Sequence, residues 1–192
     1  MQVGLFFGSF NPIHNGHIQI ASYFLQATEI TEIWFVVSPQ NPFKTNNTDL
    51  LDKNTRLHLI ELAIKNNTSF KTCKIEFDLP RPSYTVDTLK ILRENFPNYT
   101  FIPIIGGDNL HAFHHWKNYE EILSLHDIYV YKREGFKSNS LLKNNNKIIE
   151  FDVPLLNISS TQIRNHIKSK EPIDTLVPQA VEQYIKVHNL YR

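Results

Sequence analysis

Apolar residues follow two different spacings along the chain. Short continuous apolar runs are typical of strands buried on both faces, and recurrence every three or four positions is typical of helices. The runs predict strands at residues 3–7, 32–37, 70–77, 100–105, 127–131 and 147–151. The helical spacing predicts helices near residues 17–26, 54–65, 85–95, 161–169 and 178–188. Strands that alternate with helices indicate parallel β-α-β units with right-handed crossovers.

Polar segments at residues 38–49 and 133–146 are expected to be loops. The 192 residues suit one domain, residues 1–192, with a small helical C-terminal portion at about 158–192. The predicted fold class is therefore α/β, with a doubly wound parallel sheet. In such sheets ligands bind outside the carboxyl ends of the strands, so the segments after each strand are where chemistry is expected.

Composition narrows the class of protein. Lys plus Arg number 20 and Asp plus Glu number 19, which gives no global reason to expect binding to nucleic acid or a membrane. The single cysteine, Cys73, has no intrachain partner and lies in a predicted strand, so we expect a structural role and a reducing compartment. No Lys or Arg precedes Lys44, and no apolar run approaches the ~20 residues of a membrane span. These features predict a cytoplasmic protein.

The turn after the first strand, residues 8–17, reads GSFNPIHNGH. Its glycines allow close approach of the backbone to a ligand. The following helix offers unpaired N–H groups and a positive dipole end, which favour a phosphate. His14 and His17 can donate hydrogen bonds to phosphoryl oxygens, and a bound phosphate could keep one imidazole protonated. The structural alternative is a tight turn with a capping histidine; a helical zinc site would need two histidines four positions apart with a neighbouring glutamate.

A second candidate turn, residues 158–164, reads ISSTQIR. Ser159 and Gln162 have the spacing of a capping box, so a helix should begin here. Arg164 follows Ser160 by four positions and should lie on the same helix face, where its guanidinium can meet two phosphate oxygens. Taken alone, this segment is better explained as an ordinary helix cap with a surface arginine.

The middle of the chain carries further polar and aromatic candidates. The helix start at Tyr84 and Thr85 can receive a carboxylate or a phosphate. Gly106 can approach a nucleotide closely, and Asp108 can accept hydrogen bonds from ribose hydroxyls. Trp116 can stack on a flat aromatic ring. Each also has a structural alternative, as a helix cap or as a core residue.

These segments carry a family resemblance. Residues 8–17 resemble the GTFDPxHxGH signature of the nucleotidyltransferase superfamily of adenylyl- and cytidylyltransferases, and residues 158–164 match its ISSTxIR signature at every defined position. The resemblance implies a Rossmann-like fold and catalytic roles for His14, His17 and Arg164. It implies an ATP site made of Gly8, Ser9, Phe10, His14, His17, Gly106, Asp108, Ser160, Thr161 and Arg164. Asn11 stands where aspartate is common, so no catalytic role is assigned to it.

The central segments PSYTVDTL, IIGGDNL and FHHWKNYEEIL are similar to the bacterial nicotinate-nucleotide adenylyltransferase branch. That similarity implies AMP transfer from ATP to nicotinate mononucleotide, giving nicotinate adenine dinucleotide and pyrophosphate, in NAD biosynthesis. It implies substrate contacts from Tyr84, Thr85 and Trp116, with Lys44 as an extra phosphate ligand. Lys117 takes a position where some relatives have an aromatic residue. Mg²⁺ would accompany ATP, held by substrate and water, and no protein metal ligand is assigned.

Several alternatives stay open. The acceptor could instead be nicotinamide mononucleotide or phosphopantetheine, or the chain could be a non-catalytic nucleotide sensor, although both signatures are intact. The spacing of His111, His114 and His115 could bind a metal on a helix, but surface or packing roles are expected. The sequence does not give the oligomeric state and leaves a homo-oligomer open.

Overall fold

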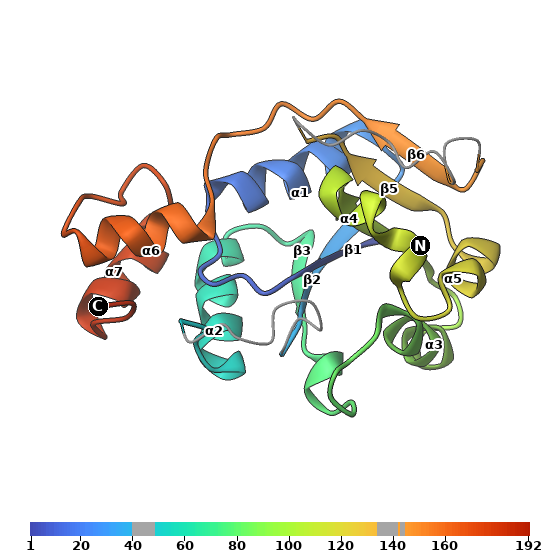
Figure 1. Cartoon of the computed structure of the whole chain (residues 1–192), viewed down its shortest axis with the longest axis horizontal. Helices are drawn as coiled ribbons and strands as arrows, with labels where there is room; N and C mark the ends of the chain where they lie inside the picture. The colour runs from blue at the N-terminus through green and yellow to red at the C-terminus, as the bar shows by residue number, and fades with distance from the viewer. Residues whose placement is uncertain (40–48, 134–141, 143–144) are drawn as a thin grey trace.

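The computed structural model describes residues 1–39, 49–133, 142 and 145–192. Its centre is a six-stranded parallel sheet with the strand order β3-β2-β1-β4-β5-β6 (Figure 1). The strands are β1 (Gln2–Gly8), β2 (Glu32–Val37), β3 (Phe70–Cys73), β4 (Thr100–Gly106), β5 (Ile128–Tyr131) and β6 (Ile148–Phe151). The strand order reverses between β1 and β4, as in a doubly wound Rossmann-like sheet. The predicted fold class is therefore confirmed.

Helices cover both faces of this sheet. One apolar core contains side chains from α1 (Asn15–Ala27), α2 (Lys53–Ile64), α6 (Ser160–Lys168) and α7 (Gln179–Val187). The other contains side chains from α3 (Thr85–Asn95), α4 (Gly107–His111) and α5 (Tyr119–Leu125). Figure 1 shows α6 and α7 at one end of the molecule beside α2, with α3 and α5 at the opposite end.

Alternation along the central strands supplies both cores. On β1, Phe6 points into the core under α1 while Leu5 points into the core under α3. On β2, Phe35 points into the core under α1 and Trp34 points into the core under α3. Successive side chains of a strand face opposite ways, so continuous apolar runs are what a sheet covered on both sides requires. No helix in the described part of the chain is long and apolar enough to cross a membrane.

Most predicted elements match the structure to within one or two residues, with one clear error. The strand predicted at residues 70–77 ends at Cys73, and a short 3₁₀ helix, η1 (Ile75–Phe77), follows. The backbone N–H of Phe77 donates to the carbonyl of Lys74, which closes the turn and directs Glu76 inward. The short helices α4 and α5 were not predicted as separate elements, and Pro178 precedes α7 as its cap instead of being its first residue.

Candidate functional site

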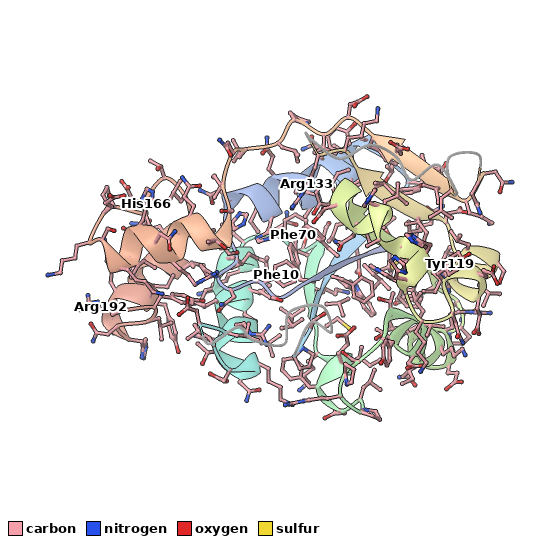
Figure 2. The ribbon with its side chains drawn as sticks, viewed as in Figure 1. Phe10, Phe70, Tyr119, Arg133, His166 and Arg192 are labelled. Carbon is pink, nitrogen blue, oxygen red and sulfur yellow. The ribbon has the colours of Figure 1, made fainter. Side chains whose placement is uncertain are left out.

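The turn between β1 and α1 is anchored by Phe10. Its ring is 2% exposed and packs edge-on against Phe6 and His17, and its backbone adopts a φ of 47°, uncommon for a residue with a side chain. A Cβ atom at Gly8 would come within 2.8 Å of the Phe10 ring, so only glycine fits there. Figure 2 shows Phe10 among the central side chains, close to the start of α1. Since the ring is in the core, only the backbone of Phe10 is placed to meet a nucleotide.

The two predicted imidazoles lie against one another at this turn. The rings of His14 and His17 stack with centroids 3.6 Å apart, and the backbone N–H of His14 donates to Nδ1 of His17 at 3.3 Å. Nδ1 of His14 is buried and has no hydrogen-bond partner. This nitrogen faces the start of α1, where a Cβ atom at Gly16 would come within 3.1 Å of it, and the two histidines have the arrangement of a capping box.

Burial controls the charge of both imidazoles. Burial, and then the nearby Arg133 guanidinium, lower the pKa of His14 to about 4. Burial, His14 and Arg133 hold the pKa of His17 well below its usual range. In the ligand-free protein both rings are therefore neutral at pH 7. The negative charges of a bound phosphate would act in the opposite direction and favour protonation, as the sequence analysis anticipates.

The second signature meets the first in space. Nη1 of Arg164 donates to the backbone carbonyl of Asn11 at 2.9 Å, and Oγ of Ser160 donates to the carbonyl of Pro12 at 2.9 Å. Nη2 of Arg164 lies 3.3 Å from Oγ1 of Thr161. The expected convergence of these two segments, about 150 positions apart, is therefore present. One half of the predicted capping box is present, since Oγ of Ser159 accepts from the N–H of residue 162 at 3.1 Å.

Among the described residues, three buried side-chain atoms have no hydrogen-bond partner: Nδ1 of His14, Nε of Arg164 and Oδ1 of Asp108. All three belong to residues that the sequence places in the ATP site. Oδ2 of Asp49 lies 3.9 Å from Nε of Arg164. An unsatisfied buried donor or acceptor is costly, so each of these atoms is a candidate for contact with a polar ligand.

A third part of the site follows β4. Gly106 caps α4, and a Cβ atom there would overlap Oδ1 of Asp108, so glycine is needed for this carboxylate to take its place. Arg133, labelled in Figure 2, follows β5. Its guanidinium approaches Oδ2 of Asp108 at 3.5 Å and the hydroxyl of Tyr131 at 3.3 Å. Arg133 was not identified from the sequence, because it falls at the start of a polar segment that is expected to be a loop. Its position two residues after a strand was the available signal.

A cavity of about 330 Å³ adjoins the first turn. Gly8 and Ser9 line it on the β1 side, and Tyr84, Thr85 and Trp116 line it on the other. The Trp116 ring packs against Phe113 with centroids 4.9 Å apart. The structure therefore brings the predicted aromatic and helix-start residues into one cavity beside the predicted phosphate turn.

Two further buried ionic side chains support the site and were not identified from the sequence. Arg56 is fully buried and donates to the carbonyls of Ser9 at 2.7 Å and Ser38 at 2.8 Å, and also to those of Pro39 and Leu51. Glu76 accepts from the hydroxyls of Ser83 at 2.8 Å and Thr88 at 3.0 Å, and burial raises the pKa of this carboxyl. Nothing in the local sequence distinguishes either residue from a surface charge.

Other candidates are placed as follows. Lys44 lies outside the described residues. His115 lines the cavity, and its ring lies 3.7 Å from that of His114. Within the described ranges, no group of three or more His, Cys, Asp or Glu residues could hold a metal ion. Cys73 is buried at the end of β3, as expected of a structural residue.

Known proteins resemble this chain along its whole length. A family model described as cytidylyltransferase-like matches residues 5–166. A probable nicotinate-nucleotide adenylyltransferase of Cytophaga hutchinsonii is 47% identical over 191 residues, covering 100% of this chain and 98% of the relative. One from Flavobacterium johnsoniae is 47% identical over 193 residues and covers 100% of both. The solved Plasmodium falciparum nicotinic acid mononucleotide adenylyltransferase complexed with NaAD has a TM-score of 0.80 and 25% identity, covering 99% of this chain and 97% of that one.

Proposed function

Because this chain belongs to the cytidylyltransferase-like family and, within it, to the nicotinate-nucleotide adenylyltransferases, we propose that it transfers AMP from ATP to nicotinate mononucleotide. The products are nicotinate adenine dinucleotide and pyrophosphate, and the step belongs to NAD biosynthesis. The observation that carries this assignment is the contact between Arg164 and the histidine turn, directly beside the cavity lined by Trp116.

The reaction needs no covalent enzyme intermediate. A 5′-phosphate oxygen of nicotinate mononucleotide attacks the α-phosphorus of ATP, the bond to the bridging oxygen breaks, and pyrophosphate leaves with that oxygen. Neither group requires a protein nucleophile, so positioning and charge stabilisation supply the rate enhancement. Catalysis by positioning and charge stabilisation agrees with a site that contains imidazoles and guanidinium groups in place of a carboxylate cluster.

The residues of the two signatures take complementary roles in this proposal. His14, His17 and Arg164 neutralise charge on the ATP phosphates, and Ser160 and Thr161 place hydroxyls beside them. Arg133, which lies close enough to lower the pKa of both histidines, adds a further positive charge on the same side. The start of α1 contributes less than a free helix end would, because the N–H of Asn15 already donates to the carbonyl of Leu176 at 2.9 Å.

Asp108 accepts hydrogen bonds from ribose hydroxyls in this arrangement, which satisfies its buried oxygen. In the neighbouring cavity, Trp116 stacks on the pyridine ring, and the start of α3 at Tyr84 and Thr85 receives the nicotinate carboxylate. Lys44 remains proposed as an additional phosphate ligand.

Mg²⁺ is proposed to accompany ATP. The donor set suits an ion held by phosphate oxygens and water, because the described residues provide no carboxylate-rich cage. Such an ion neutralises charge on the pyrophosphate group. We further propose a cytoplasmic location.

The deciding experiment measures pyrophosphate release from ATP and Mg²⁺ with a panel of acceptors: nicotinate mononucleotide, nicotinamide mononucleotide and phosphopantetheine. Release that depends on nicotinate mononucleotide, with nicotinate adenine dinucleotide as the product, supports the proposal. Preference for another acceptor would reassign the enzyme within the superfamily. Nucleotide binding without release, under any acceptor, would identify a nucleotide sensor.

A further inference from the structure

Lys117 occupies the mouth of the cavity that holds Trp116. It lines that cavity together with Tyr84 and Thr85, and its Nζ lies 4.7 Å from the centroid of the Tyr84 ring. Among the described residues that line the cavity, it is the one Lys or Arg. This ammonium group is therefore a cation that a substrate in the cavity can meet.

The partner of Lys117 lies in the first turn of α3. Nζ of Lys117 is 2.9 Å from Oδ2 of Asp87, the third residue of that helix. Both side chains are partly exposed, 44% for the lysine and 40% for the aspartate, so the pair lies at the rim and can rearrange at little cost. The ammonium group is thus held close to the helix start by an interaction that is weak in water.

The carboxylates around the cavity make this cation important. Glu76 lines the cavity, and Asp87 stands at the helix start that the proposed function assigns to the nicotinate carboxylate. Without a compensating cation, the negative charge of Asp87 would oppose an acidic ring substituent and leave a neutral amide unaffected. An ammonium group reverses that preference, because it gains a charge-assisted hydrogen bond to a carboxylate that an amide cannot match.

We propose that Lys117 is a specificity-determining residue: its ammonium group neutralises Asp87 and binds the carboxylate of the pyridine ring, which selects the acid over the amide. This inference rests on the proposed function, since it assigns the cavity to the pyridine ring. It predicts that Lys117 contributes to recognition of one ring substituent, the carboxylate.

The test compares kcat/KM for nicotinate mononucleotide and nicotinamide mononucleotide in the full-length protein and its Lys117→Met variant. We expect the value for the acid to fall about fivefold, the scale of a partly exposed ion pair, while the value for the amide stays within about twofold. Lys117→Arg should retain most of the wild-type ratio, because it restores the charge.

Lys90→Met is the matched control. Lys90 makes an ion pair of the same 2.9 Å length with Glu121 and is similarly exposed, at 47%, but it does not line the cavity. Its ratio of kcat/KM for the acid to kcat/KM for the amide should equal that of the wild type. An equal fall in kcat/KM for both substrates in Lys117→Met would show that the lysine only joins α3 to the Trp116 segment. That result would overturn the inference.

Two further results separate this inference from the function itself. Asp87→Asn should not lower the ratio of kcat/KM for the acid to kcat/KM for the amide, because the ammonium group of Lys117 then interacts with the substrate alone. A ratio reduced as far as in Lys117→Met would assign the selectivity to the ion pair and contradict the inference. Calorimetric titration with each mononucleotide gives a readout independent of turnover. If the wild type turns over neither substrate, the proposed function fails, and equal acid binding by wild type and Lys117→Met in that titration would refute the role of Lys117 separately.

Discussion

The hydroxyl of Tyr191 donates a hydrogen bond of 2.9 Å to Oδ1 of Asn11, although 180 positions separate the two residues. The same oxygen accepts from the N–H of Leu51 at 3.2 Å, and Nδ2 of Asn11 donates to the carbonyl of Asp49 at 2.9 Å. The backbone carbonyl of Asn11 holds Arg164. An amide is required here because a carboxylate could not donate to a carbonyl oxygen. This network gives a physical reason for asparagine where the family signature commonly has aspartate.

Tyr191→Phe removes one hydroxyl from this network and leaves the packing of the ring intact. We expect the KM for ATP to rise about threefold, on the scale of one lost hydrogen bond, because Asn11 then holds the carbonyl that orients Arg164 less firmly. The KM for nicotinate mononucleotide should not change. Steady-state kinetics with each substrate varied in turn measure this, with Tyr184→Phe on α7 as the control. An equal rise in both constants would indicate a general loss of structure.

His17→Ala should reduce kcat much more than it weakens ATP binding. If the imidazole stabilises charge that develops during phosphoryl transfer, its removal lowers kcat by about 10²-fold or more and changes the dissociation constant of ATP only slightly. Rapid-quench turnover and equilibrium titration measure the two quantities. His188→Ala, at an exposed position after α7, is the control. Unchanged turnover in His17→Ala would remove this residue from the mechanism.

The sequence was most informative where local signals coincide. The bounds of α3 were predicted to the residue because a polar helix start and Pro97 flank a periodic apolar segment. The meeting of the histidine turn with Arg164 followed from matching both signatures. In contrast, Arg56 and Glu76 could not be recognised, because their roles depend on carbonyl and hydroxyl partners that only the tertiary structure assembles. The error at Phe77 has the same origin, since inward hydrogen bonding by Glu76 accompanies the end of β3.

Arg56→Met should destabilise the protein severely. The guanidinium is fully buried and serves four backbone carbonyls, and removing it leaves those acceptors without donors. Unsatisfied buried acceptors cost about 1–3 kcal/mol each before relaxation, so we expect a loss of at least about 3 kcal/mol in the free energy of unfolding. Urea denaturation measures this loss. Arg93→Met, at an exposed position on α3, should change stability by less than about 0.5 kcal/mol. Similar losses of unfolding free energy in both variants would contradict the role of Arg56 as the donor to these buried carbonyls.

Acid should destabilise the ligand-free protein through His14. In the folded state its pKa is about 4, against 6.5 when exposed, so between these values the unfolded chain binds a proton that the folded protein excludes. Stability from this residue is therefore complete above about pH 6.5 and is lost as the pH falls towards 4, by about 2 kcal/mol at pH 5. Urea denaturation at pH 7.5 and pH 5 should show a smaller acid-induced loss in His14→Gln than in the wild type, because glutamine does not titrate. The comparison cancels the contributions of groups whose pKa does not depend on His14, including the buried His126. It reports His14 together with its effect on the pKa of the neighbouring His17. An identical loss in the two proteins would mean that the pKa of His14 is the same in the folded and the unfolded protein. Burial would then not keep this imidazole neutral.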